Sequence, residues 1–202
     1  MTNEITGSGD FAVATMQSNV ASDNSFGVEG RYVVECHDAQ GNLKWKEEFD
    51  NQVVQVGKIL MLTALLQTTT TVVGPYLGLV SGSSSTFSPL DTMATHAGWT
   101  EFTNYTVGGS AVRGTASFAT PTGNGSSTSG SNIVTASATA MTYTITGAGG
   151  TVGGCFLVTG SGASSTQSST GGTLYSAGAF GTAKTTTAGD TVSVTYSTTA
   201  TS

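Results

Sequence analysis

The sequence predicts a mainly β fold: an antiparallel β-sandwich of jelly-roll type, with one helix at about residues 51–67 and an extended N-terminal arm. Three observations predict this class. Short segments alternate apolar and polar residues, which is the period of a half-buried strand. Clusters of Gly, Ser and Thr with turn character separate these segments. Threonine, a β-branched residue that suits a pleated surface, is abundant throughout the chain.

The first 25 residues differ from the rest in being small and polar, with apolar residues only at isolated positions. A segment with so few apolar side chains does not bury enough surface to offset the entropy of ordering itself. We therefore expect residues 1–25 to form an arm that contacts a partner, and residues 26–202 to form a single β-sandwich domain with the helix inserted. The partner contacts expected in the arm are Ile5, Phe11, Val13 and Met16.

The segment 26–49 predicts a β-hairpin. Tyr32, Val34 and Cys36 alternate with polar or outward positions, "DAQGN" supplies a turn, and residues 43–48 alternate again. Lys and Glu gather on one face of the second strand, so we expect that face to contact water.

"DNQVVQVGKILMLTALLQ", residues 50–67, has the spacing of an amphipathic helix. Asp50 or Asn51 is expected to cap its first turn. The apolar stripe is expected to pack on one side of the sheet, and Gly57 should cost about 1 kcal/mol relative to alanine.

The rest of the chain predicts further short strands joined by Gly/Ser/Thr turns. No repeat of constant period is visible, which argues against a solenoid or a propeller. The expected strands are 75–82, 110–120, 132–147, 153–160, 171–180 and 190–198.

The charge balance excludes several partners. The net charge is −6, and six Lys and Arg residues are too few and too scattered for a phosphate-binding surface. We therefore expect neither nucleic acid nor an anionic membrane as a partner. No apolar run reaches the length of a membrane span. The N-terminus lacks the features of a secretory signal. Charged residues make up only 9% of the chain, which favours a surface that packs against copies of itself or a large assembly.

The two cysteines, Cys36 and Cys155, lie far apart in the chain and each has strand-forming neighbours. This pattern is typical of buried free thiols in a protein made in a reducing cytoplasm.

One stretch, "DTMATHAGWTEF" at residues 91–102, raises the question of catalysis because it holds Asp91, His96 and Glu101. A serine nucleophile needs a histidine base and an orienting acid, and no nucleophile-elbow, phosphate-loop or metal-binding motif accompanies them. Cys36 and His37 point to opposite faces of one strand, which is wrong for a shared ion. We expect no catalytic, cofactor-binding or metal-binding residues and no enzyme activity.

The same stretch has the composition of an apolar plug beneath a loop, with polar residues that fix a turn. The residues expected to form this structural plug are Asp91, Met93, His96, Trp99 and Phe102.

Several segments together resemble a known group of proteins. They are "DAQGNLKWKEEFDNQVVQVGKILML", "YLGLVSG", "DTMATHAGWTEFTNYT" followed by Arg113, and "GTLYSAGAFGTAKTTTAGDTVSVTY". In this order they are similar to small structural proteins of tailed bacteriophages. The resemblance covers roughly residues 27–118 and 153–197, and its most specific parts are the central block and the final "AGDTVSVTY". Residues 1–26 and 121–131 are not covered.

The resemblance implies a virion protein without catalytic residues. The first expectation is a capsid decoration (cement) protein, made in the host cytoplasm, that binds the major capsid protein on the outer capsid surface and also binds copies of itself, as a trimer rather than a dimer. The alternative is a tail or head fibre component that contacts host-surface glycan. In that alternative, Trp99, Tyr105 or Tyr175 would stack on sugar.

Overall fold

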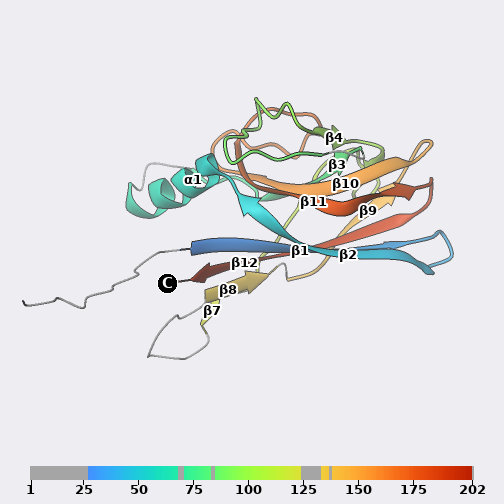
Figure 1. Ribbon diagram of the computed structural model, residues 1–202, viewed down its shortest axis with the longest axis horizontal. Coiled ribbons are helices and arrows are strands. Elements are labelled where there is room, and N and C mark those ends of the chain that lie inside the picture. Colours follow the sequence, from blue (N-terminus) through green and yellow to red (C-terminus); the bar gives the residue numbers. More distant parts are fainter. Residues whose placement is uncertain (1–26, 68–70, 83–84, 124–132, 137, 202) are drawn as a thin grey trace, which may run out of the picture.

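A computed structural model describes residues 27–67, 71–82, 85–123, 133–136 and 138–201. It confirms the mainly β, antiparallel sandwich-like class: the described strands form an antiparallel sheet that folds over into two layers and nearly closes on itself (Figure 1). The elements in chain order are β1 (Gly27–His37), β2 (Leu43–Val53), α1 (Gln55–Leu66), β3 (Tyr76–Ser81), β4 (Thr100–Phe102), β5 (Tyr105–Thr106), β6 (Gly114–Thr115), β7 (Thr122–Gly123), β8 (Ile133–Ala136), β9 (Met141–Ile145), β10 (Gly150–Thr159), β11 (Thr173–Thr186) and β12 (Thr191–Thr201).

The lower layer in Figure 1 is built around β1, which pairs with β2 on one side and with β12 on the other. The register sets Tyr32 opposite both Phe49 and Tyr196, so aromatic side chains from three strands meet on the inner face. On the outer face, Arg31 bonds Glu48 across the ladder. The period-two pattern thus separates an apolar inner face from a charged outer face.

The upper layer has β10 at its centre, between β3 and β11. The short strands β4 and β6 pair with β3. A short pairing of β11 with the end of β2, at Ser176 with Val53 and Ala177 with Gln52, joins the two layers at one side.

Two apolar clusters stabilise this arrangement. The larger lies between the layers and combines residues from the first strand to the last, including Tyr32, Val34, Leu77, Tyr143, Cys155 and Tyr196. The smaller lies on the outer face of β3, β10 and β11, beneath the loops before β4 and after β10: Val54, Val80, Met93, Trp99, Phe156, Val158, Ala163, Leu174 and Ala177.

The helix begins later than the sequence predicted. Residues 51–53 belong to β2, where Asn51 pairs with Gly30, and Val54 occupies the cap position without a side-chain bond. The cap expected from Asp50 or Asn51 was wrong because the ladder with β1 continues through both residues, and Asp50 bonds Arg31 instead.

The apolar face of α1 packs on the sheet less than expected. Within the helix only Gly57 is buried, and it lies against the backbone of Tyr175 in β11. Four large apolar side chains remain more than half exposed: Ile59 (54%), Leu62 (55%), Leu65 (75%) and Leu66 (72%).

Two of the strands predicted from the sequence were also longer than those in the structure. Within 110–120 only Gly114 and Thr115 pair as a strand, because Val112 bridges to Thr166 and the Arg113 side chain is buried in contacts to a loop. The segment 132–147 contains two strands, β8 and β9, that both pair with β12. The partner contacts expected in the arm, Ile5, Phe11, Val13 and Met16, lie outside the described residues.

Both thiols are fully buried and free. Burial and the nearby Asp190 carboxylate raise the pKa of Cys36 to about 11, and burial raises the pKa of Cys155 well above its ordinary value. At neutral pH we expect both to stay protonated and to react slowly with a thiol reagent until denaturant is added, because the thiolate is the reactive form. Rapid labelling of the native protein, or a mass lower by two hydrogens, would refute this.

Candidate functional site

The segment before β4 folds onto the outer face of the upper layer, with Trp99 at its centre. The Trp99 side chain packs between Phe87 and Phe156, with ring centroids 5.6 and 5.2 Å away, and is 4% exposed. Met93 is buried in the same cluster. The segment therefore covers the apolar outer face of β10 at Phe156.

The polar side chains of this segment hold its turns. Asp91 accepts hydrogen bonds from the Trp99 indole nitrogen (3.0 Å) and from the Ser88 amide (3.0 Å). His96 donates from Nδ1 to the Trp99 carbonyl oxygen (2.9 Å), and its ring stacks on the Trp99 ring at 3.9 Å. Asp91 and His96 are thus both tied to Trp99, which gives each of them a structural role.

Of the five residues expected to form the plug, Asp91, Met93, His96 and Trp99 lie together. Phe102 is buried elsewhere: it belongs to the core between the layers, with its ring 6.4 Å from that of Tyr105. Phe102 is the last residue of β4, and the pairing of β4 with β3 places it opposite Leu79, on the inner face.

Sequence reasoning did not identify the strongest polar contact nearby, a buried ion pair between Glu101 and Arg113. The guanidinium donates from Nε to Glu101 Oε1 (3.0 Å) and from Nη2 to Oε2 (2.6 Å). The Arg113 and Glu101 side chains are 0% and 7% exposed. Paired parallel bonds of this kind are the strongest form of Arg–carboxylate contact.

The same two side chains fix the loop that follows β10. Arg113 also donates to the carbonyl oxygens of Ser164 (3.2 Å) and Ser169 (2.8 Å), while Glu101 Oε2 accepts from the Ser168 amide (2.8 Å). The guanidinium lies 5.2 Å from the Phe156 ring. In the sequence, the one feature that pointed to this ion pair was the isolation of Arg113, since no further charged residue follows it until Lys184.

These groups line a cavity of about 250 Å³, formed by Met93, His96, Trp99, Glu101 and Arg113 among others. The side chains of His96, Trp99, Glu101 and Arg113 in this cavity each have a hydrogen-bond partner. Within the described residues, His96 bonds no nucleophile. Those residues also contain no cluster of three or more His, Cys, Asp or Glu that would hold a metal. The contacts of His96, Trp99, Glu101 and Arg113 therefore give these side chains a structural role in the fold.

This assignment predicts the behaviour of two variants. Asp91→Ala should lower the free energy of unfolding by about 1–3 kcal/mol, because it leaves the buried Trp99 N–H without its acceptor. His96→Ala should lower it by less, since the backbone turn remains. Leu90→Ala, at an exposed neighbour (68% exposed), serves as control. Thermal melting measures the effect, and a hydrolytic rate that disappears in these variants would contradict it.

The aromatic residues proposed to stack on a glycan are not available for that contact. Trp99, Tyr105 and Tyr175 are 4%, 1% and 8% exposed. Tyr105 and Trp99 are enclosed by other rings, and the Tyr175 hydroxyl meets Met61 and Thr198. All three side chains belong to the two apolar clusters, so none presents the exposed ring face that stacking on a sugar requires.

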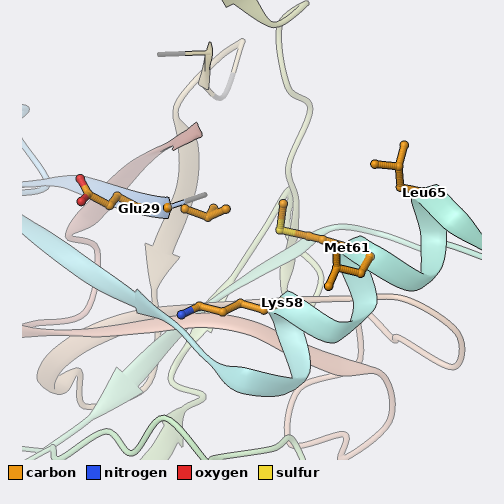
Figure 2. Close-up of a pocket in the computed structure, with 7 residues that line it drawn as sticks. Glu29, Lys58, Met61 and Leu65 are labelled. Atoms are coloured by element: carbon orange, nitrogen blue, oxygen red, sulfur yellow. The ribbon is translucent and has the colours of Figure 1, made fainter. Parts of the chain in front are cut away.

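The second candidate site is an apolar groove between the start of β1 and the exposed side of α1. Its volume is about 600 Å³, and its lining is Gly27, Val28, Glu29, Lys58, Met61, Leu62 and Leu65. Figure 2 shows Met61 and Leu65 on the helix and the Glu29 carboxylate directed away from them. We call this feature the α1 groove.

A series of contacts connects two residues on opposite sides of the groove, Met61 and Glu29. The Tyr175 hydroxyl contacts the Met61 sulfur (3.4 Å) and the Thr198 hydroxyl (3.5 Å), and Thr198 in turn donates to the Glu29 carbonyl oxygen (3.1 Å). These contacts connect α1, β11, β12 and β1, so they fix the position of the helix relative to the start of β1. Such concave apolar surfaces are typical binding sites.

The described part of the chain contains no helix of the length and apolarity needed to cross a membrane. Comparison of the whole chain with protein-family models, curated proteins and solved structures gave no significant match.

Proposed function

We propose that the protein is a structural component of a phage particle, a decoration protein that binds the outer surface of the major capsid protein shell and stabilises it. The observation that carries the proposal is the exposed apolar face of α1 on the β-sandwich. Four of its large side chains are more than half exposed, and contiguous apolar surface of this kind marks a contact with another protein.

The charge distribution supports the same conclusion. Sixteen of the 18 charged residues lie at or before Arg113, so the second half of the chain carries almost no charge. A surface of hydroxyl groups and backbone has little long-range field and suits close packing against a neighbour rather than recognition of a charged ligand. The resemblance to small virion proteins of tailed phages points the same way.

The mechanism of such a protein is binding energy alone. Each subunit would contact the shell and neighbouring subunits, and simultaneous contacts raise the overall affinity far above that of each one, because later contacts form within an already tethered assembly. A protein that acts by binding stabilises the particle without any chemical step.

The arm provides the test of this proposal. Removing residues 2–22 should leave the sandwich folded, with a melting temperature in dilute solution close to that of the full chain, because both core clusters are built from residues 32–196. Binding to shells that lack the protein should fall sharply. A pelleting assay with both forms measures this. Undiminished binding of the truncated protein would show that the arm plays no part in assembly.

A further inference from the structure

We propose that the α1 groove binds the N-terminal arm of a second copy of this chain, with Phe11 and Val13 inserted between β1 and α1. The proposal rests on the function proposed above in one respect, that copies of the chain associate. The groove, the free strand edge beside it and the composition of the arm support it independently.

Among the described residues, the start of β1 has an unpaired edge on the groove side. There Gly27, Val28 and Glu29 pair with β12 on one side only, because pairing with β2 begins at Gly30 opposite Asn51. Beyond that point β2 turns away to join β11 and lead into α1. An exposed edge of this kind accepts an extended segment as an added strand.

The arm carries a segment that fits both features. Phe11 and Val13 are two positions apart, so in an extended strand their side chains lie on the same face. A segment laid along Gly27–Glu29 would direct both into the groove, where Met61, Leu62 and Leu65 supply apolar contacts. A volume of about 600 Å³ accommodates two such side chains.

Charge favours the same occupant. Lys58, the one cation that lines the groove, forms no ion pair with the described residues. The arm carries the acids Glu4, Asp10 and Asp23 and neither Lys nor Arg. Asp10 adjoins Phe11, so an inserted Phe11 brings a carboxylate to the groove rim. The Glu29 carboxylate, which would repel it, is directed away from Met61 and Leu65 (Figure 2).

The length of the segment between the apolar part of the arm and the start of the domain favours binding to the groove of a second copy over binding to the groove of the same chain. Residues 17–25, which are mostly polar, separate Met16 from the start of the domain. At roughly 3.3 Å per residue this stretch spans up to about 30 Å. A return into the chain's own groove would need a turn of only about 2–5 residues. Because the arm leaves its own domain beside the groove, two or more copies can exchange arms in a closed, symmetric manner.

Cross-linking of two differently tagged, co-expressed chains tests the exchange without any capsid. One chain carries Phe11→Cys and the other Leu62→Cys; the native thiols are buried and stay unreactive. We expect a mixed disulfide-linked dimer after mild oxidation. The control replaces Leu62→Cys by Leu43→Cys, which is equally exposed (57% against 55%) but lies at the β1–β2 turn, and should give no mixed dimer.

A single chain with both Phe11→Cys and Leu62→Cys distinguishes the alternatives. An intrachain disulfide without mixed dimers would show that the arm binds its own groove, and no disulfide of either kind would show that it binds neither; both results overturn the proposal. Leu62→Glu should also weaken self-association by about tenfold or more in sedimentation experiments, since a buried leucine contributes at least that factor. Leu43→Glu should not. If the full-length protein forms the mixed dimer but fails to bind shells, the result counts against the proposed function alone.

Discussion

Arg113→Ala should produce the largest loss of stability of any single change considered, about 3–5 kcal/mol in the free energy of unfolding. The reason is that Glu101 would remain buried without its cation, and the carbonyl oxygens of Ser164 and Ser169 would lose their donor. For a domain of this size the melting temperature should fall by roughly 10 °C.

Two further variants separate the loss of charge from the loss of packing. Arg113→Met combined with Glu101→Leu should recover part of the stability, because an apolar pair removes the uncompensated charge. Arg31→Ala is the matched surface control: Arg31 also contacts two acids, but its side chain is 52% exposed, and water screens such pairs. An equal melting temperature for Arg113→Ala and Arg31→Ala would contradict the role given to the buried pair.

Gly57→Ala should destabilise the protein although alanine is the better helix former. Helix propensity alone predicts a gain of about 1 kcal/mol. A Cβ atom at this position would overlap the carbonyl oxygen of Tyr175 and lie 2.9 Å from its Cα, and these are backbone atoms of β11 that cannot move aside. The helix must shift to relieve this overlap, which typically costs 1–3 kcal/mol and would widen the α1 groove.

Denaturant unfolding with Thr63→Ala as control measures this effect. Thr63 also lies in α1, but its side chain is only half-buried. Its change to alanine should therefore be neutral or stabilising. Stabilisation by both substitutions would mean that α1 is not held close to β11 at Gly57.

The strands could be predicted from the sequence where one face is buried and the other is exposed to solvent. Tyr32, Val34 and Cys36 alternate with exposed or half-buried residues, and this period alone identifies both β1 and its inner face. The helix start was not predictable to the residue, because residues 51–53 satisfy a helical and an extended pattern equally. The ladder between Asn51 and Gly30 decides between them, and it depends on a segment 21 positions away.

The exposed face of α1 shows a second limit of prediction from the sequence. An apolar stripe predicts that a helix packs on something, and the sequence does not say whether that partner lies in the same domain. Here Gly57 sets the contact with β11, while Leu62, Leu65 and Leu66 face outward. The same holds for Arg113: its partners are 12 to 56 residues away in the chain, so no local pattern could identify them.

The most direct test of the proposed function is the copy number of the protein in purified phage particles. A denaturing gel, with the band of this chain quantified against that of the major capsid protein, gives the ratio of the two. A decoration protein predicts a ratio of one or a simple fraction of one, since its sites repeat with the capsid lattice. Absence from the particle, or a ratio far below one subunit per capsomer, would contradict the proposal.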